Sequence, residues 1–172
     1  MEIEVKVPIK DRAAALDRIN GLGAVLVNER DQEDLYFAHP VRDFGVTDEA
    51  LRLRKDGHRE VLTYKGPKLD GRSKTREEIE FSVPYSEMKT VLGKLGFRES
   101  FKVMKHRAEF VLEGVRVCLD DVDGLGSFVE LEFEGQDIEV GLQKIESLKK
   151  RLGLEGNETR SYLELLYIKN KR

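Results

Sequence analysis

Polar and apolar residues alternate along most of the strand-like segments of this chain, and the first residues show the pattern most clearly. They read Glu2-Ile3-Glu4-Val5-Lys6. Successive side chains of a strand point to opposite faces, so Glu2, Glu4 and Lys6 share one face. At a rise of ~3.3 Å per residue the two carboxylates lie about 7 Å apart and can converge on one hard cation. The segment therefore predicts a strand whose polar face binds a metal.

A second pair of carboxylates with the same spacing occurs far along the chain, in Phe128-Val129-Glu130-Leu131-Glu132. Glu130 and Glu132 again share one strand face. Lys6 stands one step beyond the first pair, where it can hold an anion that is bridged to the cation. Four carboxylates on two strands indicate a divalent-metal site for a phosphate substrate.

The other predicted strands carry the same alternation with basic residues added. Nearly every one has one apolar face and one charged face of mixed sign. The charged faces outside the two Glu pairs hold Arg52, Arg54, Lys65, Arg76, Glu78, Glu80, Lys105, Arg107, Glu109, Arg116 and Asp120.

Two architectures fit these faces. An open antiparallel sheet would pack its apolar face on helices and leave its charged face in water, which is the ordinary state of such sheets and is favoured by alternation alone. Alternatively, the sheet curls so that the charged faces line a water-filled tunnel. A lumen with so many bases needs an anion or facing carboxylates to compensate them, and a polyphosphate with its Mg²⁺ would supply that balance.

Hydrophobic periodicity and turn residues predict an α+β protein that forms one domain over residues 1–172, without repeats or linkers. We expect strands at 2–9, 24–28, 32–38, 49–56, 59–65, 76–83, 98–112, 115–120 and 127–134. We expect helices at 11–20, 86–95, 138–152 and 160–168. Loops are expected at 39–48 and 66–75.

Composition excludes several classes of function. The net charge of −3 gives no global attraction to nucleic acid or anionic membranes, so we expect neither as a partner. A single cysteine, Cys118, cannot form an intrachain disulfide and fits a reducing compartment. The acidic start shows no signal peptide, and no apolar run approaches the ~20 residues of a membrane span. A cytoplasmic protein is expected, and the sequence leaves open whether it forms a homodimer.

Taken together and in order, the motifs resemble those of the CYTH superfamily, the triphosphate tunnel metalloenzymes. They most resemble the small stand-alone class IV adenylyl cyclases. The resemblance covers most of the chain. Besides the two Glu motifs, it rests on Gln32-Glu33-Asp34-Leu35-Tyr36-Phe37, Asp48-Glu49-Ala50-Leu51-Arg52-Leu53-Arg54, Thr63-Tyr64-Lys65-Gly66-Pro67, Arg76-Glu77-Glu78-Ile79-Glu80, Lys105-His106-Arg107, Leu119-Asp120, Leu125-Gly126-Ser127 and Ser161-Tyr162-Leu163-Glu164-Leu165-Leu166.

The resemblance implies a closed antiparallel barrel of eight strands, with helices packed outside. It also implies a nucleoside triphosphate or other polyphosphate as substrate and Mg²⁺ or Mn²⁺ as cofactor. The implied metal ligands are Glu2, Glu4, Asp120, Glu130 and Glu132. The implied substrate-binding residues are Lys6, Arg52, Arg54, Lys65, Arg76, Lys105 and Arg107. The implied catalytic residues are Glu2, Glu4, Lys6, Glu130 and Glu132.

Three functions remain in competition. A class IV adenylyl cyclase would convert ATP to cyclic AMP and pyrophosphate. A triphosphate hydrolase would let water attack tripolyphosphate, thiamine triphosphate or a nucleotide. A non-catalytic polyphosphate- or nucleotide-binding module would not need so many carboxylates. Phosphoryl chemistry depends mainly on positioning and charge stabilisation, so no Cys or His nucleophile is required.

Overall fold

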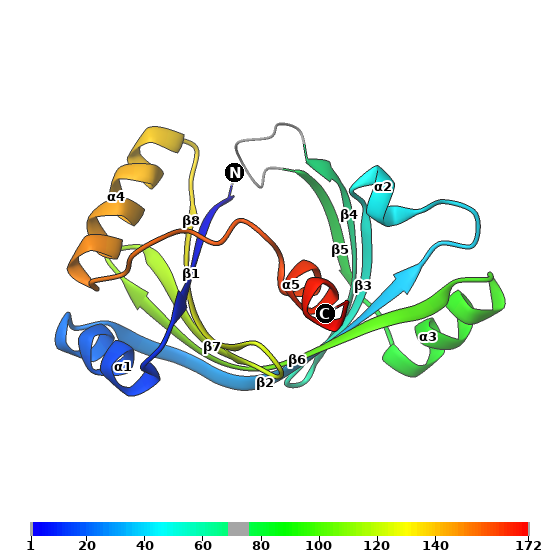
Figure 1. The fold of residues 1–172 in the computed structure, drawn as a ribbon, viewed down its shortest axis with the longest axis horizontal. Coiled ribbons are helices and arrows are strands. Elements are labelled where there is room, and N and C mark those ends of the chain that lie inside the picture. Colours follow the sequence, from blue (N-terminus) through cyan, green and yellow to red (C-terminus); the bar gives the residue numbers. More distant parts are fainter. Residues whose placement is uncertain (1, 69–75, 172) are drawn as a thin grey trace. The chain divides into compact units, whose positions relative to one another are not determined.

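The protein is described here from a computed structural model, which covers residues 2–68 and 76–171; the side chains of Glu2 and Lys68 lie outside that description. Figure 1 shows the strands and helices of these residues. The strands are β1 (Glu2–Ile9), β2 (Val25–Ala38), β3 (Ala50–Asp56), β4 (Arg59–Lys68), β5 (Arg76–Ser82), β6 (Arg98–Leu112), β7 (Val115–Val122) and β8 (Gly126–Glu134). The helices are α1 (Arg12–Gly21), α2 (Phe44–Thr47), α3 (Tyr85–Lys94), α4 (Ile138–Arg151) and α5 (Tyr162–Asn170).

The eight strands form one sheet in the order β1-β8-β7-β6-β2-β3-β4-β5, and the pairs with a known register are all antiparallel. The α+β class is as predicted, and eight is the strand number that the family resemblance implies, one fewer than the segments expected from periodicity. The closure is not as predicted: over the described residues, the sheet ends at β1 and β5 without pairing between them. One cause lies at β1 itself, where the Lys6 carbonyl accepts the Glu158 N–H at 2.7 Å. The segment before α5 thereby occupies part of the edge that a closed barrel would use.

The contacts within the chain define two compact units, whereas the sequence predicts one domain, which stays a prediction. The terminal unit comprises residues 1–30 and 105–172, and the central unit comprises residues 31–104. Strands β2 and β6 each contribute residues to both units. Each unit is described below by itself.

The core of the terminal unit lies between its strands and two helices. α1 and α4 lie on the same side of these strands (Figure 1). Ile19 of α1 and Ile145 of α4 are almost fully buried against Val117 and Leu131, which alternate with charged residues along β7 and β8. The charged faces of the strands therefore point away from α1 and α4.

The core of the central unit is smaller. Leu35, Leu53 and Leu62 come from three successive strands and pack with Tyr85 and Leu92 of α3. These apolar residues again alternate with charged ones, so the charged face of the central unit points away from α3.

Three local predictions were wrong. The two extended segments at 24–28 and 32–38 are one strand, because polar residues between them are tolerated on its solvated faces. The loop at 39–48 contains α2, a single turn capped by Asp43, which is too short to show a periodic signal. The loop predicted at 66–75 starts later, because β4 continues to Lys68 through an irregularity in its pairing; residues 69–75 lie outside the described part of the chain.

None of the helices that the structure describes has both the length and the apolar character needed to cross a membrane.

Candidate functional site

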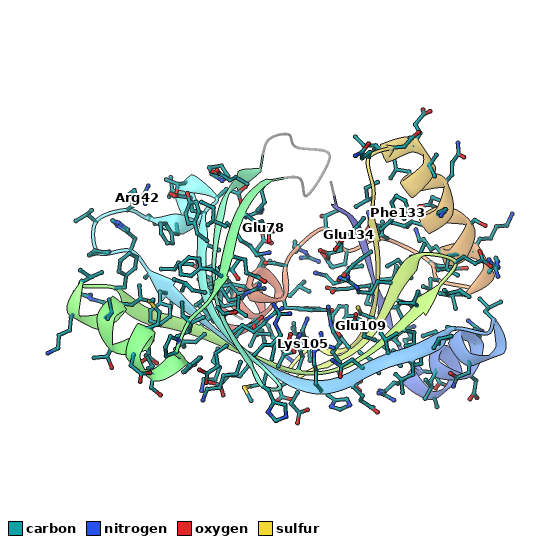
Figure 2. The ribbon with its side chains drawn as sticks, turned by 180° about the vertical axis from the view of Figure 1, so that it is seen from behind. Arg42, Glu78, Lys105, Glu109, Phe133 and Glu134 are labelled. Atoms are coloured by element: carbon teal, nitrogen blue, oxygen red, sulfur yellow. The ribbon has the colours of Figure 1, made fainter. Side chains whose placement is uncertain are left out.

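Six charged side chains are buried in the described part of the terminal unit, and we call them the terminal cluster. They are Lys6, Lys105, Arg107, Asp120, Glu130 and Glu132. The strand register explains why they meet, since Lys6 stands opposite Glu130 in the pairing of β1 with β8. Arg107 stands opposite Asp120 in the pairing of β6 with β7. All six sequence-predicted residues therefore lie on one charged face. Figure 2 shows Lys105 and Glu109 rising from the same side of β6.

Arg107 is the centre of the terminal cluster. Its Nε donates to Asp120 Oδ1 at 2.7 Å, and its Nη2 donates to Asp120 Oδ2 at 2.6 Å, which is a bidentate pair. The same guanidinium also contacts Glu130, and its Nη1 lies 3.4 Å from Glu132 Oε1. Burial opposes its charge, but Glu130 and Asp120 outweigh it and raise the pKa of Arg107 well above its usual value. Arg107 therefore stays a cation with three carboxylates around it.

The two lysines of the terminal cluster flank the ring of Tyr162, the first residue of α5. Lys6 Nζ lies 4.3 Å from the ring centroid and Lys105 Nζ lies 5.0 Å from it. Lys105 also donates to Asp120 Oδ2 at 3.1 Å, while Lys6 Nζ lies 3.9 Å from Glu130 Oε1. The ring of Tyr162 thus lies beside two buried ammonium groups, which together can attract an anion with several charges.

Cys118 is a potential nucleophile near the terminal cluster, and its side chain is fully buried. Burial is the main factor that raises the pKa of its thiol, and Arg107 counteracts this only in part. The thiolate is the reactive form, so this cysteine is suited to packing rather than to nucleophilic attack.

The central unit carries a second group of polar residues, four of them charged, which we call the central cluster: Asp34, Arg52, Arg54, Thr63 and Glu80. Arg54 donates from Nε and Nη2 to the two carboxylate oxygens of Asp34, at 2.6 and 2.7 Å. Arg52 Nη2 donates to Thr63 Oγ1 at 3.2 Å and lies 3.6 Å from Glu80 Oε2. Both predicted arginines therefore have fixed directions, and Arg52 is only 7% exposed.

Lys65 and Arg76, the other predicted phosphate ligands of the central unit, lie at the margin of this face. Lys65 Nζ donates to Glu78 Oε1 at 2.8 Å, and its side chain is 25% exposed. Arg76 contacts Asp48 through the carboxylate, at 3.6 Å, and through the backbone carbonyl, at 3.4 Å. Both are held by groups that are more exposed than the carboxylates around Arg107.

The predicted metal ligands are brought together only in part. Glu4 stands opposite Glu132 in the register of β1 and β8, two pairs away from Glu130, whereas the side chain of Glu2 is outside the described residues. Among the residues that the structure describes, no group of three Asp, Glu, His or Cys side chains is arranged to hold a metal ion. The guanidinium of Arg107 lies among these carboxylates instead.

The donor chemistry nevertheless fits a hard cation, because carboxylate oxygens are the ligands that Mg²⁺ takes together with substrate phosphates. Glu4, Glu130 and Glu132 are the residues best placed to supply them. Asp120 is fully buried and already accepts hydrogen bonds from Lys105, Arg107 and Tyr162. A metal at Asp120 would have to displace these donors, so its role as a ligand stays a prediction.

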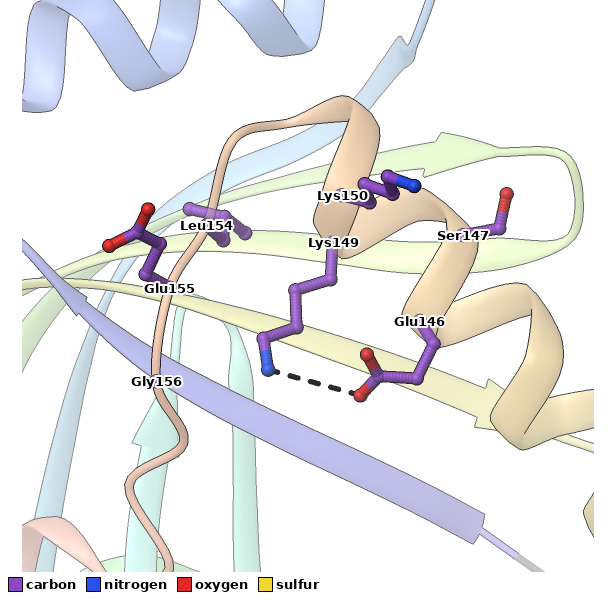
Figure 3. A pocket seen from close by; sticks show the side chains of 7 residues that line it. All are labelled: Glu146, Ser147, Lys149, Lys150, Leu154, Glu155 and Gly156. Carbon is purple, nitrogen blue, oxygen red and sulfur yellow. Dashed lines mark ion pairs between the residues drawn. The ribbon is translucent and has the colours of Figure 1, made fainter.

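A hollow on the described part of the chain lies away from both clusters. It has a volume of about 560 Å³ and is formed by the end of α4 and residues 154–156 (Figure 3). Lys149 points into this region and pairs with Glu146 at 3.8 Å. Its other lining residues carry no set of groups suited to catalysis.

Asp34 of the central cluster and Tyr162 beside the terminal cluster were not among the predicted site residues. Asp34 faces Arg54 directly in the pairing of β2 with β3, and this register could not be read across the loop that contains α2. Tyr162 lies at the start of a helix and is 42 residues from Asp120, to which its hydroxyl donates. Strand alternation could not reveal this contact. The capping box of that helix, Ser161 with Glu164, was readable and marks where the helix begins.

Comparison with known proteins agrees with this arrangement of charged strands. The model of the CYTH domain matches residues 1–162. The chain belongs to the CYTH family. This CYTH protein is 40% identical over 171 residues to the protein of Methanocaldococcus jannaschii named "Putative adenylate cyclase MJ0240", with 96% of this chain and 98% of the relative covered.

Other relatives of this CYTH protein have different names. It is 26% identical to the "Putative triphosphatase YjbK" of Bacillus subtilis, with 100% of this chain and 99% of the relative covered. Among solved structures, the PH1819 protein of Pyrococcus horikoshii OT3 superimposes with a TM-score of 0.87 at 38% identity, covering 98% of this chain and 99% of the other. The family and the fold are therefore shown, while the names of the relatives divide between two reactions.

Proposed function

We propose that this CYTH protein is a divalent-metal-dependent enzyme that acts on triphosphate substrates. The observation that carries the proposal is the buried terminal cluster, in which Lys6, Lys105 and Arg107 alternate with carboxylates on neighbouring strands. Burying three cations is costly unless they are compensated, and a fold that needed only stability would gain more from apolar residues of similar size. Retaining the charges is reasonable if they bind a polyanion.

The proposed phosphate ligands are Lys6, Lys105 and Arg107 in the terminal unit and Arg52, Arg54, Lys65 and Arg76 in the central unit. Arg offers a planar fork for phosphate oxygens, and Lys offers a point charge. The proposed catalytic residues remain Glu2, Glu4, Lys6, Glu130 and Glu132, and the carboxylates of the four Glu residues would hold Mg²⁺ or Mn²⁺. The bound metal would neutralise charge that develops on the phosphates.

Our first candidate for the reaction is that of an adenylyl cyclase. The 3′ oxygen of ATP forms a bond to the α-phosphorus, the bond from that phosphorus to the bridging oxygen breaks, and pyrophosphate leaves. The proton of the 3′ hydroxyl is lost to solvent or to a carboxylate of the site. The M. jannaschii relative, 40% identical along nearly the whole chain, supports this candidate by its name.

The second candidate is a triphosphatase. Water attacks the terminal phosphorus, the bond from that phosphorus to the bridging oxygen breaks, and orthophosphate and the diphosphate are released. The observation that favours it is the chemistry of the two clusters, whose lysines and arginines are suited to phosphate oxygens rather than to a purine edge. The B. subtilis relative is named for this activity.

A product assay tests both candidates. The protein is incubated with ATP, tripolyphosphate or thiamine triphosphate in Mg²⁺, and cyclic AMP, pyrophosphate and orthophosphate are separated. Lys6→Met should abolish the activity, whereas Glu155→Gln, an exposed residue outside both clusters, should leave it unchanged. Cyclic AMP with pyrophosphate identifies the cyclase. Orthophosphate without cyclic AMP identifies the hydrolase, and from tripolyphosphate it is released together with pyrophosphate. No product from any substrate, with tripolyphosphate still bound, would leave only a binding module.

A further inference from the structure

Tyr162 is the only buried residue of α5 among those described, and its direction is fixed by the way the helix begins. Ser161 Oγ accepts the Glu164 N–H at 3.1 Å, and Glu164 Oε2 accepts the Ser161 N–H at 2.6 Å. This reciprocal cap satisfies two of the free N–H groups at the helix start and defines the first turn. The ring that follows Ser161 is therefore aimed at the strands by a rigid element.

The phenol hydroxyl of Tyr162 joins the hydrogen bonds of the terminal cluster. It donates to Asp120 Oδ2 at 2.9 Å. The same oxygen accepts Lys105 Nζ at 3.1 Å and Arg107 Nη2 at 2.6 Å. Through this one carboxylate oxygen, Tyr162 is linked to two of the three buried bases.

The ring of Tyr162 contacts Lys6, which is the third buried base, and it also contacts Lys105. Both ammonium groups lie within about 6 Å of its centroid, the range in which an aromatic face attracts a cation. Phe128 packs against the ring edge-on, with the centroids 5.0 Å apart, and so limits its movement. Lys6 and Lys105 repel one another, and a ring that attracts both fixes where each ammonium group lies.

The segment before α5 strengthens the same arrangement at the backbone. The Glu158 N–H donates to the Lys6 carbonyl at 2.7 Å, and the Glu158 carboxylate pairs with Arg160 at 2.7 Å. The C-terminal segment therefore holds Lys6 at two points, its carbonyl and its ammonium group.

We propose that Tyr162 is a positioning residue of the phosphate site, whose ring holds the Lys6 and Lys105 ammonium groups in place for a polyphosphate chain. This inference rests on the proposed function and adds to it the residue that orders the two lysines. Without the ring, both long side chains would have to be ordered when the anion binds. The cost of ordering two such side chains corresponds to about a tenfold loss of affinity.

Calorimetric titration with the non-hydrolysable imido analogue of inorganic tripolyphosphate, in buffer with Mg²⁺, tests the inference. Tyr162→Leu should raise the dissociation constant about tenfold, and in the turnover assay it should raise KM with little change in kcat. Tyr162→Phe keeps the ring and should bind within about threefold of the wild type. Tyr167→Leu is the matched control, because Tyr167 lies on the same helix, is 45% exposed and contacts Lys171 in the same way. It should bind like the wild type.

The outcomes separate the two claims. A wild type that does not bind the analogue overturns the proposed function and the inference with it. A wild type that binds, with Tyr162→Leu unchanged, overturns the inference alone, as does an equal loss in Tyr162→Leu and Tyr162→Phe. If Tyr162→Leu is unfolded at the assay temperature, Tyr162→Met replaces it and should show the same loss.

Discussion

Replacing Arg107 by Met should destabilise the protein strongly, because three buried carboxylates lose their shared cation. The Arg107 side chain is 8% exposed, and it contacts Asp120 through two hydrogen bonds as well as Glu130 and Glu132. Removing one partner of a buried ion pair costs about 3–5 kcal/mol. Lys105 and Tyr162 still donate to Asp120 in the variant, so we expect the lower part of that range.

Urea denaturation followed by circular dichroism measures this loss, and thermal denaturation supports it. A loss of about 3 kcal/mol corresponds to a fall in Tm of about 6–12 °C for a chain of this size. An ordinary domain has a free energy of unfolding of about 5–15 kcal/mol, so at least about 2 kcal/mol should remain and the variant can be measured. The matched control is Arg116→Met. Arg116 also pairs with Glu132, at 3.0 Å, but its side chain is 40% exposed, and the change should cost less than about 1 kcal/mol.

A double-mutant cycle shows whether charge is the cause. In the double variant with Asp120→Asn, the most buried of the three carboxylates is neutral. The double variant should therefore be more stable than the sum of the single losses predicts, by about 1.5–3 kcal/mol. In Arg107→Met alone, the uncompensated carboxylates gain raised pKa values in the folded state. The folded state of the variant then binds more protons than its unfolded state. The loss of stability relative to the wild type should therefore shrink as the pH falls. A loss of less than about 1 kcal/mol, or a cycle that is additive at every pH, would refute this account of the cluster.

Three further outcomes follow from the two clusters and the segment before α5. Tripolyphosphate should compete with ATP, and Arg54→Ala should weaken both by a similar factor of about ten to a hundred in competition binding; an effect on ATP alone would contradict phosphate recognition. Glu4→Gln, Glu130→Gln or excess chelator should abolish turnover, and full activity in any of them would exclude a metal held there. Arg160 holds the pKa of Glu158 at about 2, below its unfolded value of about 4.3, so this stabilisation is complete above pH 4.3 and is lost toward pH 2. Glu158→Gln should flatten that part of the pH dependence of urea denaturation, and an unchanged profile would show the pair to be unimportant.

The alternation in the sequence predicted most of the strands because it has a direct physical cause. One face of each strand packs on helices and the other carries charges, so β1 and β6 could be bounded correctly from residue type alone. The register of β6 with β7 was also readable in principle. Glu113 and Gly114 form a two-residue turn with positive φ at both, and such a turn fixes Arg107 opposite Asp120.

The pairing of distant strands was beyond the same reasoning. Lys6 and Glu130 are neighbours across β1 and β8, which are more than a hundred residues apart in the chain, and no turn determines their register. The failure to predict the open edge of β1 has the same origin, because the hydrogen bond from Glu158 to Lys6 depends on where the C-terminal segment returns. Residue patterns thus identify the charged faces, whereas long-range packing decides which charges meet.

The balance of charge in the terminal cluster constrains how ligands can bind there. Its described members are three cations and three carboxylates, so the buried cluster has no net charge when each group is ionised. A polyphosphate alone would place several negative charges next to Asp120, Glu130 and Glu132, and a divalent cation alone would meet Arg107 and two lysines. Either ligand by itself leaves buried charge uncompensated, whereas the two together largely neutralise one another. If each ligand raises the affinity for the other, thermodynamic reciprocity requires the same factor in both directions. The alternation of bases with carboxylates is therefore a reason to expect that the metal and the polyphosphate bind as a pair.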